Sequence, residues 1–167
     1  MFKFVSDKLK FRRSKTCKEH TVPYNGKLIQ DFEDEHLTII NLFKQIASVR
    51  VDIGFNPLLD THLSEFKSKF QEHLIIENLE LYKYLEQNFD GNSSSEAITN
   101  AFKQDMNDVA SHISHFCTAY ESQEFDAKKL DDFDAAYHEI SITLNHRFHL
   151  EERELFELYK DTSLEKG

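Results

Sequence analysis

A histidine and a glutamate stand four residues apart in the segment HLIIENLELYKYL, as His73 and Glu77. Four residues make about one turn of an α-helix, so both side chains leave the same face. At about 100° per residue, that face is otherwise apolar, with Phe66, Phe70, Leu74, Leu81 and Tyr84 within about 60° of Glu77. An imidazole and a carboxylate on such a face are costly unless something compensates them. A bound metal ion, or a buried hydrogen bond between the two side chains, would supply that compensation.

Further candidate ligands lie on the apolar faces of other segments. His36 is at the centre of the apolar face of DFEDEHLTIINLFKQIASV, and Glu151 falls on the inner face of the last long segment. His146 precedes Glu151 by five residues, and His112 flanks a third apolar seam. Imidazoles with carboxylates and no thiolate suit iron or manganese better than copper. The alternatives are that His36 is a core histidine bonded to Glu77, and that His112 lies half-exposed on the surface.

Four amphipathic segments position these residues, at about 28–49, 57–89, 96–122 and 130–159. Ser94 or Ser95 is expected to cap the third helix. The chain has only four glycines and two prolines, which favours long helices over many short strands. We therefore predict an all-α, up-down-up-down antiparallel four-helix bundle, in which mid-helix residues meet at a similar height.

The chain of 167 residues suits one domain with a sizeable core. We divide it into a basic N-terminal extension at 1–26, the bundle at 27–160 and a C-terminal tail at 161–167. It has no apolar run long enough to span a membrane and no secretory signal pattern. Its two cysteines, Cys17 and Cys117, form no paired motif, so a reducing cytoplasm is the expected location.

Charge is unevenly spread along the chain. The net charge is −10, yet residues 1–18 carry seven Lys or Arg against one Asp. The acidic body argues against nucleic-acid binding. The basic extension, with its interleaved Phe, Val and Leu, is either a short amphipathic helix that contacts a membrane or an acidic partner, or a segment that packs on its own acidic bundle. We favour the packed segment.

Three stretches resemble hemerythrin-like domains, the HHE cation-binding family. LIQDFEDEHLTIINLF is similar to the family's first helix, where His36 matches the first iron-ligating histidine. HLIIENLELYKYL resembles the second helix, so the resemblance makes His73 an iron ligand and Glu77 the bridging carboxylate. EERELFELY is similar to the end of the fourth helix, where Glu151 would bind or bridge the irons. The resemblance covers residues 28–159 and implies a non-haem di-iron centre that binds or senses dioxygen, nitric oxide or iron.

The chain departs from the family pattern on its third and fourth helices. Oxygen-carrying hemerythrins place a His-x-x-x-His pair on helix three, whereas this chain has His112 and His115, three residues apart. The ligand set that the resemblance implies is thus His36, His73, Glu77 and Glu151, with His112 and His146 as further candidates.

On helix four, the residue four positions before Glu151 is Arg147. The remaining pairings are His146 with Glu151, or His149 with Glu154. The sequence is therefore also compatible with a mononuclear site, a weakened site or a bundle that has lost its metal. In those cases Arg147 would neutralise a site carboxylate.

Three functions are compatible with this sequence. The first is an iron-binding module that takes up or senses dioxygen, nitric oxide or iron. The second is a di-iron enzyme that consumes peroxide or oxidises ferrous iron. The third is a metal-free interaction module on the same scaffold. No phosphate-binding loop or nucleophile–base pair is visible, so we rank binding or sensing above enzymatic turnover.

Overall fold

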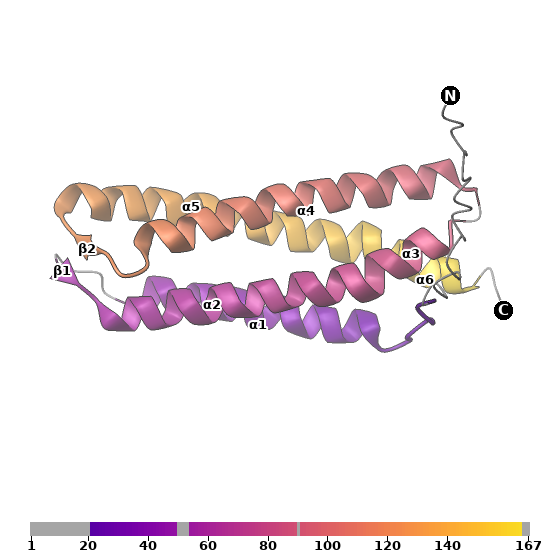
Figure 1. Cartoon of the computed structure of the whole chain (residues 1–167), viewed down its shortest axis with the longest axis horizontal. Coiled ribbons are helices and arrows are strands. Elements are labelled where there is room, and N and C mark those ends of the chain that lie inside the picture. Colours follow the sequence, from indigo (N-terminus) through magenta and orange to yellow (C-terminus); the bar gives the residue numbers. More distant parts are fainter. Residues whose placement is uncertain (1–20, 50–53, 90, 165–167) are drawn as a thin grey trace, which may run out of the picture.

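The computed structural model describes residues 21–49, 54–89 and 91–164. Four long helical rods lie side by side (Figure 1). The second and fourth rods each contain a π-helical segment between two α-helices. The rods are α1 (Leu28–Ser48), then α2 (Pro57–Ile76) with η1 (Glu77–Tyr82) and α3 (Lys83–Gln87), then α4 (Ser93–Tyr120), and last α5 (Ala127–Leu150) with η2 (Glu151–Leu155) and α6 (Phe156–Leu164).

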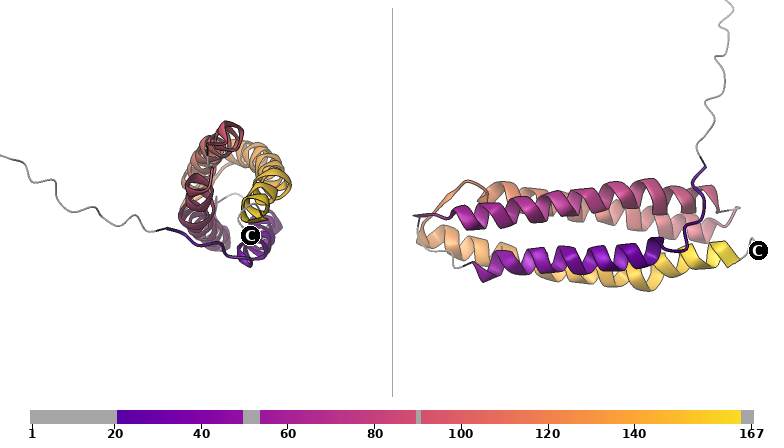
Figure 2. Two further views of the ribbon diagram at one scale, coloured as in Figure 1. Left: turned by 90° about the vertical axis from the view of Figure 1, so that its right-hand side faces the viewer. Right: turned by 90° about the horizontal axis from the view of Figure 1, so that it is seen from below.

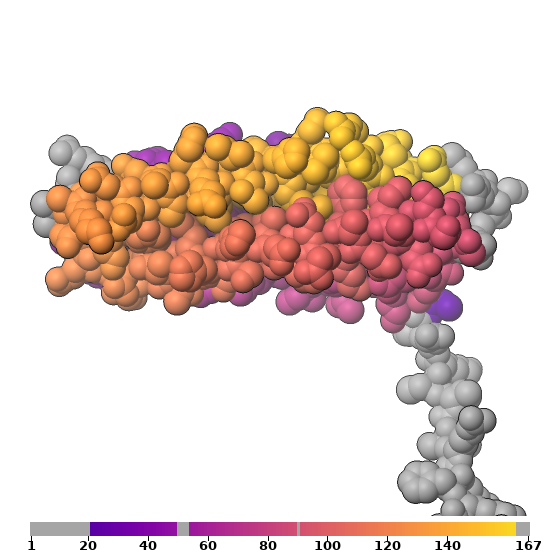
Figure 3. Space-filling view, turned by 90° about the horizontal axis from the view of Figure 1, so that it is seen from above, coloured from indigo at the N-terminus to yellow at the C-terminus, as the bar shows by residue number. Residues whose placement is uncertain are grey.

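Helices that follow one another along the chain run antiparallel and form a closed ring in cross-section. Helix α1 contacts α2 and α5, and α4 contacts the same two helices. The end-on view of Figure 2 shows this ring. Figure 3 shows α4 and the α5–α6 rod packed along one side of the bundle. The predicted four-helix bundle is confirmed.

Asparagine side chains cap the first turns of α2 and α4. The Asn56 side chain accepts hydrogen bonds from the amides of Leu58 and Leu59 at the start of α2. Asn92 does the same for Ser94 and Ser95 at the start of α4. The prediction that a serine caps this helix is therefore wrong: Asn92 is the residue with extended backbone just outside the helix, where a side-chain oxygen can reach the first free amides.

A short two-stranded β-sheet joins two inter-helix connections at one end of the bundle. Strand β1 (Gly54–Phe55) pairs antiparallel with β2 (Glu124–Phe125). Gly54 has φ of 113°, a backbone conformation that residues with a Cβ rarely adopt. The β-sheet holds the α1–α2 and α4–α5 connections against each other, so it fixes the ends of all four rods.

The core is divided along the bundle axis into two apolar clusters. One lies toward the β-sheet and includes Phe43, Phe66, Phe116 and Phe125. The other lies toward α3 and α6 and includes Phe32, Tyr82, Phe156 and Tyr159. Every rod passes from one cluster to the other, and the buried charged side chains fall at this boundary: His36, His73, Glu77, Arg147 and Glu151. The helices thus bring one polar layer to mid-bundle height.

The basic extension predicted at residues 1–18 lies outside the described residues, so its contacts stay a prediction. Among the helices of the described part, none is both long and apolar enough to cross a membrane.

Candidate metal centre

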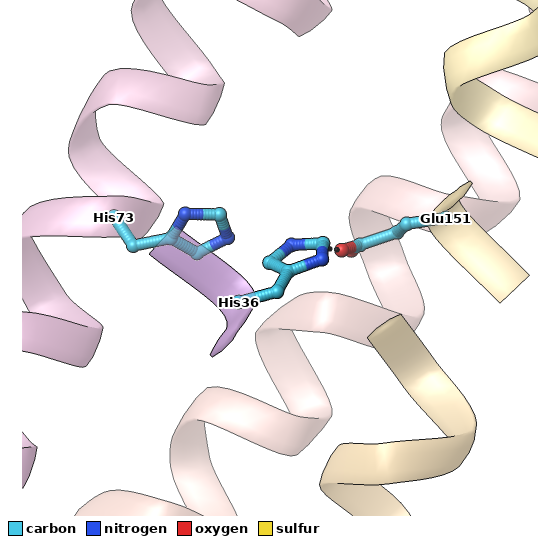
Figure 4. A group of neighbouring side chains, drawn as sticks. All are labelled: His36, His73 and Glu151. Atoms are coloured by element: carbon cyan, nitrogen blue, oxygen red, sulfur yellow. Dashed lines mark ion pairs between the residues drawn. The ribbon is translucent and has the colours of Figure 1, made fainter. Parts of the chain in front are cut away.

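Four buried side chains in the polar layer carry potential metal ligands. His36 comes from α1, His73 from α2, Glu77 from η1 and Glu151 from η2, and each is at most 2% exposed. They are the only buried imidazoles and carboxylates in the described part of the chain. One ligand atom each from His36, His73 and Glu151 lies within 4.8 Å of the others (Figure 4).

Both carboxylates begin a π-helical segment. Glu77 is the first residue of η1 and Glu151 the first residue of η2. A π-turn contains one more residue than an α-turn, and such segments are rare and concentrated at functional sites. Each widened turn changes the helical phase of the residues after the carboxylate. The two rods therefore present an inward carboxylate at mid-bundle and still return apolar residues such as Leu81 and Leu155 to the core.

Each imidazole is oriented by a carboxylate outside the cluster. Nδ1 of His36 lies 2.8 Å from Oε1 of Glu152, and Nδ1 of His73 lies 3.0 Å from Oε2 of Glu35. An ionised carboxylate only accepts hydrogen bonds, so each Nδ1 donates. Each neutral ring then keeps its lone pair on Nε2. A carboxylate–histidine pair of this kind fixes the tautomer in metal sites and makes the ligand nitrogen more basic.

Aromatic packing limits the rotation of both rings. The His36 ring stacks on Phe148, with centroids 3.8 Å apart and planes 6° apart. The edge of Phe32 meets His73, with centroids 5.4 Å apart. The two imidazoles are themselves 5.0 Å apart, centroid to centroid. These contacts preorganise the two Nε2 atoms before any ligand binds.

Arg147 is the cation of the layer. Its Nη2 lies 2.8 Å from Oε1 of Glu151, one turn further along the same rod. The same nitrogen donates to the Phe102 carbonyl oxygen at 2.9 Å and to the Tyr82 hydroxyl at 3.2 Å. Arg147 thus joins η2, α4 and η1 at the edge of the cluster.

Burial and mutual repulsion disfavour two ionised carboxylates here. Burial raises the pKa of Glu77, and the neighbouring carboxylate of Glu151 raises it further. Burial also raises the pKa of Glu151, although Arg147 opposes the shift. Burial lowers the pKa of His36, which keeps that ring neutral. The hydrogen bond from His73 lowers the pKa of Glu35, so this orienting group stays ionised.

Several buried polar atoms of the layer have no hydrogen-bond partner. They are Nε of Arg147, Nε2 of His36, Nε2 of His73, and both carboxylate oxygens of Glu77 and of Glu151. Nε2 of His36 approaches Oε2 of Glu151 to 3.3 Å, and Arg147 lies close to Oε1, but neither contact has the alignment of a hydrogen bond. Unpaired lone pairs on two imidazoles and two carboxylates, aimed at one region, fit a cation. A direct His–Glu hydrogen bond, the alternative to metal, does not satisfy them.

The structure does not bring His112 and His146 to this cluster. Both are exposed. His112 lies with His115 and Glu139 at a surface hollow of about 190 Å³ between α4 and α5. His146 directly precedes Arg147, and the helical phase that turns Arg147 inward turns His146 out. The pairing of His149 with Glu154 is likewise on the surface, where both residues are exposed.

Glu35 and Glu152 were not singled out by the sequence patterns. Each is adjacent in sequence to a site residue, but each is only partly buried and reaches a histidine on another rod. Apolar periodicity gives no signal for such residues. The one hint in the sequence is that Glu35 directly precedes His36 and Glu152 directly follows Glu151.

The comparison with protein families agrees with this geometry. The model of the hemerythrin HHE cation-binding domain matches residues 27–159. The chain belongs to this family. Searches among curated proteins and among solved structures gave no match. The protein is thus a hemerythrin HHE domain with a buried His–His–Glu candidate metal site.

Within this hemerythrin HHE domain, α4 is the rod that contributes no side chain to the candidate cluster. Its buried side chains at the level of the layer are Phe102 and Met106. The imidazole pair that oxygen-carrying hemerythrins have on this helix is therefore not reproduced in the described structure.

Proposed function

We propose that this hemerythrin HHE domain binds iron through Nε2 of His36, Nε2 of His73 and the carboxylate of Glu151, with Glu77 as a further carboxylate ligand. The observation that carries the proposal is the meeting of three buried ligand atoms within 4.8 Å. Two histidines and one carboxylate with open coordination positions are the ligand set of many non-haem ferrous sites. The outer carboxylates Glu35 and Glu152 hold both rings in the ligating tautomer.

The burial of the site supports a small ligand over a large substrate. All four ligand residues are at most 2% exposed, so a macromolecule or a bulky metabolite does not reach them. Bound iron would supply open positions at which dioxygen or nitric oxide can coordinate. The surrounding aromatic rings would keep bulk water away, and the buried Tyr82 hydroxyl accepts a hydrogen bond from Arg147 at the edge of the layer. We therefore propose uptake or sensing of a diatomic gas, or of iron itself.

Metal analysis tests this function directly. Protein purified without chelator is loaded anaerobically with ferrous iron, desalted and analysed for metal, and its optical spectrum is followed on addition of dioxygen or nitric oxide. We expect retained iron and a ligand-dependent spectrum in the wild type. His73→Ala should lose the iron, and the exposed His138→Ala serves as the matched control.

Three other results would redirect the proposal. Wild-type protein that retains no iron after anaerobic loading would contradict it and favour a metal-free interaction module. Retention of manganese or zinc in preference to iron would keep the site but change the metal. Sustained turnover of peroxide or of ferrous iron would assign the same centre to an oxidative enzyme.

A further inference from the structure

Arg147 is the one cationic side chain buried in the polar layer of the described structure, at 2% exposed. Its guanidinium contacts Glu151, the Phe102 carbonyl oxygen and the Tyr82 hydroxyl. The guanidinium carbon also lies 4.6 Å from the centroid of the Phe102 ring. Contacts with three rods leave Arg147 little freedom to withdraw from the layer.

The ligand residues are distributed unevenly around the two carboxylates. His36 and His73 come from α1 and α2, and Nε2 of His36 lies 3.3 Å from Oε2 of Glu151 (Figure 4). Arg147 contacts the other oxygen, Oε1, and also donates to the Phe102 carbonyl oxygen of α4. A carboxylate-bridged pair of metals in a bundle is held by about six side chains from four helices. Four buried ligand residues on three rods suffice for one metal ion with added water.

The charges of the layer show what Arg147 already supplies. Glu77, Glu151 and Arg147 are its fully buried charged groups, and Arg147 contacts Glu151 at 2.8 Å. Three carboxylates that are only partly buried or exposed border them: Glu35 at His73, Glu152 at His36 and Asp105 at Arg147. A buried carboxylate needs a compensating cation, and beside Glu151 the guanidinium is that cation.

We propose that the Arg147 guanidinium takes the place of a second metal cation beside Glu151, so this centre binds one metal ion per chain. The inference rests on the proposed metal binding and specifies its stoichiometry, in place of the di-iron centre that the family resemblance implies. Since Arg147 and the metal share the carboxylate of Glu151, they also repel each other. Arg147 therefore weakens the binding of the metal that it accompanies.

Metal counting on the wild type is the first test. Protein loaded anaerobically with ferrous iron and desalted should retain one iron per chain. After oxidation it should give the electron paramagnetic resonance signal of an isolated high-spin ferric ion, whereas two bridged ferric ions couple and give none. Two irons per chain would overturn the inference and leave the proposed function intact. No iron would contradict the proposed function itself.

Charge removal at Arg147 is the second test. Arg147→Met keeps an unbranched stem without the charge, and it should bind the first ferrous ion at least about tenfold more tightly, because a nearby positive charge is gone. The rise in melting temperature on adding ferrous iron should be larger than in the wild type. Arg147→Lys keeps the charge and should retain a metal affinity and a melting-temperature rise close to those of the wild type.

The exposed Arg153→Met is the matched control and should bind metal as the wild type does. Unchanged or weaker binding in Arg147→Met would show that Arg147 only positions Glu151, and would overturn the competition between the two cations. If Arg147→Met folds only when ferrous iron is present, the iron substitutes for the missing charge, which supports the inference. If Arg147→Met does not fold with or without ferrous iron, the inference is tested by the iron count of the wild type and by the metal affinity of Arg147→Lys.

Discussion

At the scale of single residues, Glu77 combines burial with unpaired oxygens beside a second buried carboxylate, Glu151. A buried charge of this kind costs several kcal/mol in effective terms unless a proton or a cation compensates it. The two carboxylates therefore make the free protein less stable than its packing allows, and metal binding would recover that free energy.

Glu77→Gln separates the two roles of this carboxylate. The substitution keeps the shape of the side chain and removes its charge. We expect iron occupancy to fall sharply, while the metal-free protein is unchanged or stabilised by about 1 kcal/mol, or about 2–4 °C in melting temperature for a chain of this length. Metal analysis and thermal melts with chelator measure both effects, and Glu96→Gln, an exposed position, is the control. Unchanged iron content would show that Glu77 is not a ligand.

The raised pKa of Glu77 predicts a pH dependence for the metal-free protein. The folded state holds the Glu77 proton more tightly than the unfolded chain does, so this contribution to stability is complete at low pH. It is lost as the pH rises above the ordinary value of 4.5 toward the raised pKa. The Glu77→Gln variant has no ionisable group at this position and does not lose this contribution. The melting temperature of the variant minus that of the wild type should therefore increase from about pH 5 to about pH 8.

His36 contributes a pH dependence of the opposite sign. Burial lowers the pKa of that ring, so its contribution to stability is lost as the pH falls below 6.5, and the charge of Glu77 partly opposes this shift. Above pH 6.5 the His36 contribution is complete in both proteins, so the comparison is made there. A difference in melting temperature that does not change with pH would contradict the burial of an ionisable Glu77.

Glu152 tests the role of the outer carboxylates. Glu152→Ala removes the acceptor for Nδ1 of His36, so the ring no longer has a fixed tautomer or orientation. Loss of such a partner weakens metal affinity by about 10–100-fold in known sites, and we expect the same here by competition with a chelating dye. Glu152→Gln keeps an acceptor oxygen and should lose less. Glu157→Ala removes an exposed carboxylate and should leave the affinity unchanged.

At the scale of elements, both π-helical segments begin at a site carboxylate and are followed by α-helix. π-helical segments are rare and occur frequently at functional sites, so a function is expected for both. In η1 and η2, that function would be the inward placement of Glu77 and Glu151.

Metal binding should protect these two segments from hydrogen exchange. A bound ion ties the first residue of η1 and of η2 to α1 and α2, so local opening of the widened turns becomes less frequent. We expect peptides covering 77–82 and 151–155 to gain more protection on adding ferrous iron than peptides from α4, which supplies no ligand. Equal protection along all helices would indicate global stabilisation without a role for the π segments.

At the scale of the whole molecule, the described bundle has two apolar clusters that close its core on either side of the polar layer. The chain between Val22 and α1 is anchored to it as well. The Val22 amide donates to the Gln87 side chain, and the Tyr24 ring stacks on Tyr159 with centroids 5.2 Å apart.

Deletion of residues 1–18 tests the basic extension. We expect the remaining chain to keep its iron content, because every ligand residue lies in the bundle. If the extension contacts membranes, deletion should abolish binding to anionic liposomes and leave the melting temperature unchanged. A fall of about 5 °C or more, with no change in liposome binding, would instead favour the packed segment.

The sequence by itself determined the fold class and singled out the residues that form the buried cluster. Four segments with helical periodicity and few turn residues predict the bundle, because an apolar stripe must be buried whatever its partner. His36, His73, Glu77 and Glu151 could be singled out because each interrupts such a stripe. The spacing of four residues also allows Arg147 to neutralise Glu151 on the same helix.

The tertiary structure decided which side chains from outside the apolar helix faces reach the site. His146 and His112 have suitable chemistry, yet the packing of α4 and α5 leaves both in solvent. Glu35 and Glu152 lie off the apolar faces, and only the closeness of neighbouring rods brings each to a histidine. Periodicity reports which face of a helix is buried, whereas contacts between rods depend on their relative height and rotation, which no single segment of sequence specifies.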